Sequence, residues 1–186
     1  MQESRHPSLD DRFDPAVRNV DYDLGWPELA AAEIGRTRAA VGEGAVRVEH
    51  VGSTAVPGLA AKPIVDLQLS VADVGARELY VGPLEGLGYL FAPDPDSPDL
   101  HFFGKPAERP RTFNLHVCAV GSDHELRHLA LRDYLRAHPD EVARYGALKR
   151  DLVARHPQDR LDYIEGKEEY VAALERRALA WVQPAG

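Results

Sequence analysis

Apolar and polar residues alternate over residues 65–71, which predicts a strand with one buried face. Side chains along a strand point to opposite faces with a period of two. The apolar set should therefore pack into the core, and it consists of Val65, Leu67, Leu69 and Val71. The polar set should line a surface or a cleft, and it consists of Asp66, Gln68 and Ser70.

A second alternating segment, residues 46–51, precedes this strand and ends at a glycine turn. Gly52 lets a ligand approach the backbone without side-chain hindrance, and Ser53 supplies a hydroxyl group beside exposed backbone N–H groups. Such a turn suits an anion such as phosphate. A plain connector shaped by Pro57 and Pro63 explains the same residues.

Residues 101–103 and 112–120 predict two further strands. In the second of them one row is apolar, and the row opposite to it consists of Thr112, Asn114, His116 and Cys118. If this strand neighbours the strand that carries Asp66, then Asn114 or His116 comes within reach of that carboxylate. A histidine and carboxylate pair can transfer protons or bind a metal ion, and an ordinary structural pair explains the same pattern.

The last third of the chain predicts helices. Ser122 and Glu125 form a capping box, which starts a helix that runs toward Pro139. Two more helices are expected over residues 140–155 and 161–182, because their apolar residues recur at helical spacing.

Two lysines on these last helices are candidates for binding. Lys149 lies four residues after Tyr145, so the two side chains share one side of their helix. Lys167 is a cation in an otherwise apolar stripe, and such a side chain either reaches solvent or points into a polar pocket.

Length and composition indicate one α/β domain. The chain has 186 residues and 44% of them are hydrophobic, which is enough for a single core. We expect a polar, mobile lead-in over residues 1–19 and one domain over residues 20–183. A helix that begins near Pro27 and ends at Gly42 should open that domain. The expected fold is a small mixed β-sheet packed against helices, with a helical C-terminal part.

The charge balance limits the partners. A net charge of −8 argues against binding to a nucleic-acid backbone but leaves open a small anionic substrate held by local cations. The single cysteine, Cys118, cannot form an internal disulfide, which favours a reducing compartment. No apolar run approaches the roughly 20 residues that cross a bilayer, and the first residues lack the apolar segment of a signal peptide. We therefore expect a cytoplasmic protein without a membrane partner, of undetermined oligomeric state.

The segment from Gly52 to Asp66 resembles the signature of the GrpB family. It carries in order Gly-Ser-Thr at 52–54, Val-Pro-Gly-Leu at 56–59, Lys-Pro at 62–63 and Asp66. The resemblance covers most of the chain, with further landmarks at residues 21–23, 26–27, 131–136, 145–149, Tyr163 and Lys167. The GrpB family is similar to the nucleotidyltransferase superfamily, whose pattern is Gly-Ser, a spacer, and Asp-x-Asp or Asp-x-Glu on a strand. Similar domains also occur fused to a dephospho-coenzyme A kinase.

The resemblance implies a nucleotidyltransferase-like fold that binds a nucleotide or phosphorylated small molecule in a Gly-Ser/Asp cleft. It implies that the ligand is held by Gly52, Ser53, Thr54, Lys62, Gln68, Arg132, Tyr145, Lys149 and Lys167. The candidate catalytic residues are Asp66 and His116, and Mg²⁺ would be held by Asp66 and Gln68. Gln68 replaces the second carboxylate of the superfamily pattern, and Asn114 replaces the first histidine of a His-x-His pair, so support for Mg²⁺ rests on one carboxylate.

Three interpretations stay open. The first is a nucleotidyltransferase-like enzyme in which the Gly-Ser turn holds the phosphates. The second is an enzyme that uses Asp66 and His116 as an acid-base pair on a small anionic substrate. The third is a non-catalytic module that binds a nucleotide or another anion and regulates a partner.

Overall fold

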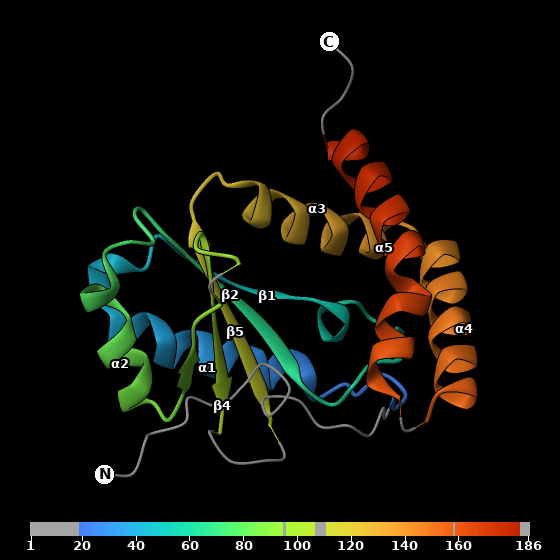
Figure 1. The fold of residues 1–186 in the computed structure, drawn as a ribbon, viewed down its shortest axis with the longest axis horizontal. Coiled ribbons are helices and arrows are strands. Elements are labelled where there is room, and N and C mark those ends of the chain that lie inside the picture. Colours follow the sequence, from blue (N-terminus) through green and yellow to red (C-terminus); the bar gives the residue numbers. More distant parts are fainter. Residues whose placement is uncertain (1–18, 95, 107–110, 158, 183–186) are drawn as a thin grey trace.

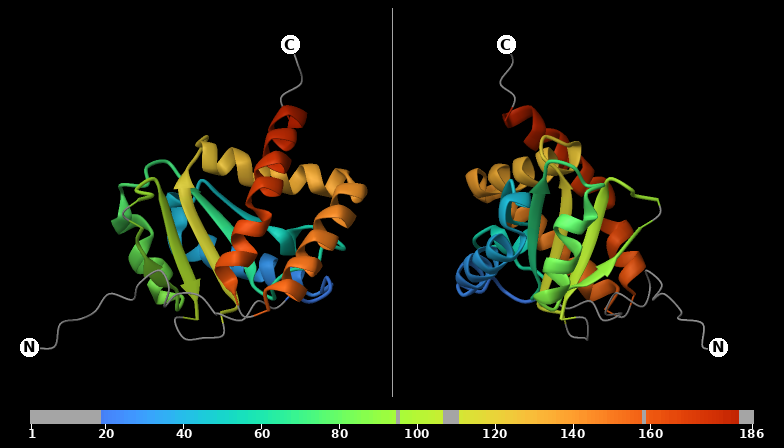
Figure 2. Two further views of the ribbon diagram at one scale, coloured as in Figure 1. Left: turned by 45° about the vertical axis from the view of Figure 1, so that its right-hand side comes forward. Right: turned by 90° about the vertical axis from the view of Figure 1, so that its left-hand side faces the viewer.

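The computed structural model describes residues 19–94, 96–106, 111–157 and 159–182. Within these residues a five-stranded sheet forms the centre of the molecule and carries helices on both faces (Figure 1, Figure 2). Its strands are β1 (Arg47–Val51), β2 (Val65–Val71), β3 (Leu90–Ala92), β4 (Leu100–Lys105) and β5 (Phe113–Ala119).

The sheet is mixed, with the strand order β1-β2-β5-β4-β3. β2 and β5 run parallel to each other, and the other neighbouring pairs are antiparallel. A parallel pair requires a crossover connection, which here contains α2 (Val81–Gly86), β3 and β4. The expected small mixed sheet with a helical C-terminal part is confirmed.

One face of the sheet is covered by α1 (Trp26–Val41). Pro27 lies in its first turn, and Gly42 ends it with a φ of 62°, which glycine adopts without a side-chain clash. The apolar residues of β2 belong to the core cluster on this face, and Leu67 and Leu69 are fully buried. The expected core face of the central strand is therefore confirmed.

The opposite face carries α3 (Asp123–Ala137), and α4 (Pro139–Arg155) and α5 (Arg160–Val182) pack against α3. The Ser122 hydroxyl accepts a hydrogen bond from the Glu125 N–H at 3.3 Å, so the expected helix start is confirmed. The three helices share a second apolar cluster with the segment that follows β1. Its buried members include Val56, Leu59, Tyr145 and Leu174.

Short 3₁₀ turns span Gly42–Gly44, Ser53–Ala55 and Arg77–Leu79. The lead-in expected over residues 1–19 lies outside the described residues except for Asn19, whose side-chain amide donates to the Tyr163 hydroxyl at 3.2 Å. Among the described helices, none combines the length and the apolar character needed to span a bilayer.

Candidate functional site

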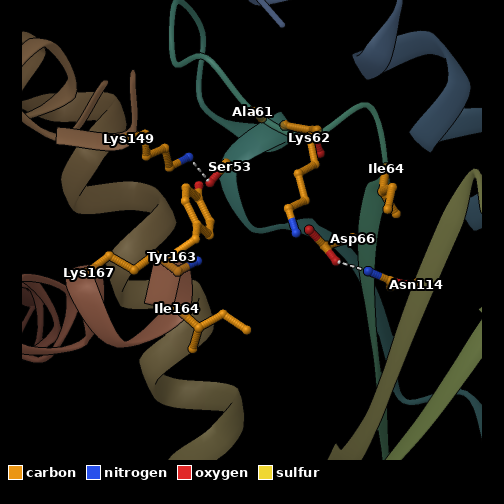
Figure 3. Close-up of a pocket in the computed structure, with 11 residues that line it drawn as sticks. Ser53, Ala61, Lys62, Ile64, Asp66, Asn114, Lys149, Tyr163, Ile164 and Lys167 are labelled. Carbon is orange, nitrogen blue, oxygen red and sulfur yellow. Dashed lines mark hydrogen bonds between the residues drawn. The ribbon is translucent and has the colours of Figure 1, made fainter. Parts of the chain in front are cut away.

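Two adjoining cavities lie where the turn after β1, strand β2 and the helices α3, α4 and α5 meet. Their volumes are about 180 and 290 Å³. Figure 3 shows the smaller one. Ser53, Asp66 and Lys167 line both cavities, so we describe the two together as the Ser53 cleft. Other residues of the smaller cavity include Thr54, Lys62, Asn114, Lys149 and Tyr163.

Gly52 brings the turn into close contact with β2. Its φ is 69°, and a Cβ atom at this position would lie 2.7 Å from the Oδ2 atom of Asp66. A residue with a side chain would strain the backbone and displace the carboxylate. The glycine therefore allows Ser53 and Asp66 to line the same cleft.

Lys149 joins α4 to this turn. Its ammonium group donates to the Ser53 hydroxyl at 2.6 Å and to the Ala60 carbonyl at 3.0 Å (Figure 3). The lysine is only 2% exposed, and its Nζ atom lies 4.5 Å from the centroid of the Tyr145 ring. Burial, together with the nearby Lys167 ammonium, lowers the pKa of Lys149 to about 7. Near neutral pH this amine is therefore partly unprotonated.

Asp66 lies next to β5, the arrangement on which its contact with Asn114 or His116 depended. β2 and β5 are neighbours, and the Asn114 amide donates to the Asp66 Oδ1 atom at 2.8 Å. The Nε2 atom of His116 lies 3.8 Å from the same oxygen. Burial opposes ionisation of Asp66, but His116 and the Asn114 hydrogen bond outweigh it, so the pKa of Asp66 lies below its usual value. The cleft thus contains an ionised carboxylate.

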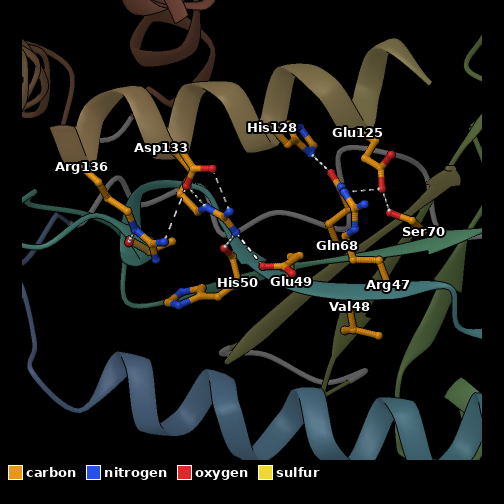
Figure 4. Close-up of polar contacts among 12 residues, drawn as sticks. Arg47, Val48, Glu49, His50, Gln68, Ser70, Glu125, His128, Asp133 and Arg136 are labelled. Carbon is orange, nitrogen blue, oxygen red and sulfur yellow. Dashed lines mark hydrogen bonds and ion pairs between the residues drawn. The ribbon is translucent and has the colours of Figure 1, made fainter. Parts of the chain in front are cut away.

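Gln68 is turned away from the cleft, although the sequence suggested it as a ligand. Its side chain is fully buried beneath α3 and lines neither cavity, and its Oε1 atom lies 2.7 Å from the Nδ1 atom of His128 (Figure 4). The prediction that Gln68 and Asp66 share a ligand is not supported by this geometry. The reason is α3, which packs on the polar row of β2 and provides Gln68 with a polar partner.

His128 is a cleft residue that the sequence reasoning missed. It lines the larger cavity, and its ring centroid lies 5.4 Å from that of His116. Burial and the neighbouring His116 lower the pKa of His128 to about 4, so its ring is neutral at pH 7. The helical spacing of Glu125, His128 and Arg132 marks a sheet-facing stripe, and that spacing could have identified it.

Arg132 lines the larger cavity, but its guanidinium already forms ion pairs with two carboxylates. Its guanidinium donates to Glu49 at 2.8 Å, to Asp133 at 2.7 Å and to the His50 carbonyl at 3.1 Å. Burial opposes the charged form, but the contacts with Asp133 and Glu49 outweigh it and raise the pKa of Arg132. Arg132 therefore holds α3 onto β1.

The remaining expected residues lie around the smaller cavity. The Nζ atoms of Lys62 and Lys167 lie 5.4 and 5.1 Å from the centroid of the Tyr163 ring. Figure 3 shows Lys62 extending toward Asp66. Thr54 is buried, and its hydroxyl lies 2.9 Å from the Nε2 atom of His50. Three lysines and one aspartate thus line the smaller cavity.

The donor set does not form a resident two-metal site. Among the residues that the structure describes, no group of three or more His, Cys, Asp or Glu side chains is arranged for a metal ion. Asp66 supplies one carboxylate to the smaller cavity, and one of its oxygens already accepts from Asn114. Asp66 would fit an Mg²⁺ ion that arrives on a ligand's phosphates, since such an ion needs only one or two protein carboxylates.

Residues 16–177 match the family described as GrpB protein. The chain belongs to the GrpB family. It is 41% identical over 170 residues to the UPF0157 protein PA4798 of Pseudomonas aeruginosa, a match that covers 90% of this chain and 69% of that protein. A solved structure of the conserved protein GrpB from Enterococcus faecalis superposes with a TM-score of 0.82 and 31% identity, covering 89% of this chain and 99% of the other.

Some GrpB-like sequences belong to longer proteins. The chain is 33% identical to the dephospho-CoA kinase of Mycolicibacterium paratuberculosis, a match that covers 91% of this chain but 48% of the kinase. The chain therefore spans about half the length of that relative. In this GrpB chain the motif residues 52–54, Lys62 and Asp66 gather at one cleft together with Lys149 and Lys167, and Gln68 is the expected ligand that lies outside it.

Proposed function

We propose that this GrpB-family chain binds a phosphorylated small molecule in the Ser53 cleft, with a nucleotide as the favoured class. One observation carries the proposal: three lysines and one aspartate line the smaller cavity, in a chain whose net charge is −8. The lysines are Lys62, Lys149 and Lys167. A local excess of cations in an acidic protein favours a small anion over an extended polyanion.

The geometry of the turn adds to this proposal. Ser53 begins a 3₁₀ turn directly after Gly52, and its hydroxyl faces the cavity beside the Lys149 ammonium. Hydroxyl groups and ammonium groups are donors that phosphate oxygens accept. The relatives named dephospho-CoA kinase also support a phosphorylated ligand, because a GrpB-like sequence forms part of those proteins.

Nucleotidyl transfer is the finer form of the proposal. In such reactions the protein mainly positions phosphates and neutralises their charge, with Mg²⁺ bridging the ligand and a carboxylate. Asp66 would hold that ion, which would neutralise charge on the phosphates. With a single carboxylate on the smaller cavity, we expect Mg²⁺ to bind there together with a nucleoside triphosphate rather than alone.

A thermal-shift titration tests the binding. ATP with Mg²⁺ should raise the melting temperature of the chain, and adenosine should not, because adenosine lacks phosphates. Lys167→Gln should weaken the apparent affinity for ATP about tenfold, the usual effect of one charge-assisted contact. Arg150→Gln, which removes an exposed cation next to Lys149 in sequence, is the matched control and should leave the affinity unchanged. Equal stabilisation by adenosine and ATP would contradict the proposal.

A second function, acid-base catalysis on a small phosphorylated substrate, is favoured by the contact between Asp66 and His116 at 3.8 Å. It predicts stabilisation by inorganic phosphate without Mg²⁺ and a loss of turnover in Asp66→Asn. A purely regulatory module predicts that the chain binds ATP without turnover and that Asp66→Asn leaves this binding intact. The dependence on Mg²⁺ and the effect of Asp66→Asn therefore separate the three interpretations.

A further inference from the structure

Ser53 and Lys149 form a close pair in which the amine has neutral oxygens as its hydrogen-bond partners. The Nζ atom of Lys149 lies 2.6 Å from the Ser53 hydroxyl oxygen and 3.0 Å from the Ala60 carbonyl oxygen. Both residues line the smaller cavity, so the hydroxyl is accessible to a bound ligand. A serine hydroxyl within hydrogen-bond distance of a basic nitrogen has the arrangement of an activated nucleophile.

The surroundings of Lys149 suit a base better than a permanent cation. The side chain is 98% buried, since its exposed fraction is 2%, and the ring of Tyr145 covers one side of the ammonium. Burial and the Lys167 charge lower the pKa of Lys149 to about 7. A substantial fraction of the molecules therefore carries a neutral amine at pH 7, and a neutral amine can accept the serine proton.

We propose that Ser53 is a nucleophile toward phosphorus and that Lys149 is its general base. The Ser53 oxygen attacks the phosphorus atom, and a new O–P bond forms. The bond from phosphorus to the leaving oxygen breaks, and that oxygen leaves with the electron pair. The serine proton moves to the Nζ atom of Lys149. The natural donor would be a phosphate ester or anhydride, and this assignment rests on the proposed function.

The charge of the cleft favours a phosphorus electrophile. Lys62 and Lys167 line the same cavity as Ser53 and can neutralise the oxygens of a phosphoryl group. The protonated Lys149 adds a further positive charge beside the new ester once the serine proton has moved. A covalent phosphoryl or nucleotidyl serine is thus stabilised by the residues that bind the ligand.

A small, neutral phosphorus electrophile tests the nucleophile without knowledge of the natural donor. Diisopropyl fluorophosphate should label Ser53, with an O–P bond formed, the P–F bond broken and fluoride released; peptide mass spectrometry locates the label. Ser53→Ala should not be labelled. Lys149→Arg keeps a cation that does not accept a proton, and Lys149→Met keeps the volume without a basic nitrogen. Both should label at least roughly a hundredfold more slowly.

The pH dependence of labelling identifies the base. The labelling rate should rise with pH and have its midpoint near 7, the pKa of Lys149. Because the Lys167 charge lowers this pKa and the Asp66 charge raises it, Lys167→Gln should move the midpoint upward and Asp66→Asn should move it downward. Arg150→Gln should leave the midpoint in place. If Lys149 only holds Ser53 in position, the pH midpoint of labelling should be the same in the wild type and in all three variants.

The outcomes separate this inference from the proposed function. Labelling of Lys149 instead of Ser53, or no labelling while ATP still raises the melting temperature, overturns the nucleophile and leaves ligand binding intact. Labelling of Ser53 without any response to phosphorylated ligands supports the nucleophile and rejects the proposed ligand class. If the Lys149 variants do not fold, the opposite midpoint shifts of Lys167→Gln and Asp66→Asn still decide the role of the base.

Discussion

Two buried charged groups on opposite sides of the sheet, Glu33 and Lys149, are held in different ways. On the α1 face, Glu33 is fully buried, and its two oxygens accept hydrogen bonds from Lys105 at 2.8 Å and Arg36 at 2.7 Å. Burial opposes its ionisation, but the two cations outweigh burial and keep the pKa of Glu33 below its usual value. The charge of Glu33 is therefore fixed by opposite charges.

Lys149, on the other side of the molecule, is almost as deeply buried but donates to a hydroxyl and a carbonyl oxygen. These neutral acceptors compensate less of the desolvation cost than a carboxylate would. The pKa of Lys149 consequently falls to about 7, whereas Glu33 stays ionised. The difference indicates that the buried charge of the α1 face serves the fold, and that the buried amine of the Ser53 cleft is free to change its protonation state.

The largest expected effect tests the structural side of this comparison. Lys105→Met removes the less exposed partner of Glu33 and should lower the free energy of unfolding by about 3 kcal/mol, as for other broken buried pairs. Arg36→Met removes the more exposed partner, whose side chain is 53% exposed against 23% for Lys105, and should cost about 1 kcal/mol. Denaturant unfolding at pH 7 measures both values. Equal losses of unfolding free energy in the two variants would show that Lys105 stabilises Glu33 no more than Arg36 does.

An intermediate effect tests the protonation of Lys149. Since its pKa is about 7 in the folded chain and roughly 10.4 when unfolded, the unfolded chain binds more protons between these values. Stability should therefore rise with pH in this window, and Lys149 should contribute about 2 kcal/mol between pH 7 and pH 9. The contribution is lost as pH falls toward 7. Denaturant unfolding of Lys149→Met should lack this rise, and Arg150→Gln should retain it. If stability changed with pH in the same way in the wild type, Lys149→Met and Arg150→Gln, the lowered pKa of Lys149 would be refuted.

The smallest expected effect comes from two glycines, one that follows α1 and one that follows β1. Gly42 and Gly52 have φ values of 62° and 69°, but only a Cβ atom at Gly52 would meet Asp66. Gly42→Ala should lower stability by about 1 kcal/mol through backbone strain alone. Gly52→Ala should cost slightly more and should also abolish the thermal shift with ATP. Retention of that shift would show that the close approach of the turn to Asp66 is dispensable.

Patterns confined to one segment predicted their structures well. The alternation over residues 65–71 identified the buried face of β2, and the Ser122 capping box identified the start of α3. These predictions succeeded because strand faces and helix caps depend on residues only two to four positions apart in the chain. The same alternation brought Asp66 and His116 to one face, and the neighbouring positions of β2 and β5 then placed them in contact.

Partner choice across elements was harder to predict. Gln68 and Asp66 share a row on β2, yet α3 covers Gln68 and provides His128 as its partner, while Asp66 remains at the cleft. Arg132 was expected to face phosphates, but Glu49 and Asp133 hold its guanidinium. Both outcomes depend on where α3 packs, and no local spacing encodes that position.

The sequence by itself determined four of the five strands of the described sheet, the positions of the long helices, the glycine turn and the membership of the GrpB family, because these follow from local periodicity and from motif residues in order. Only the tertiary structure decided the chemical state of the site. Lys149 is desolvated because α4 and α5 enclose it against the turn at Ser53, and Lys167 comes near it from a different helix. Burial and the distance between charges are properties of the packed chain, so the lowered pKa of Lys149 appears only when the elements are assembled.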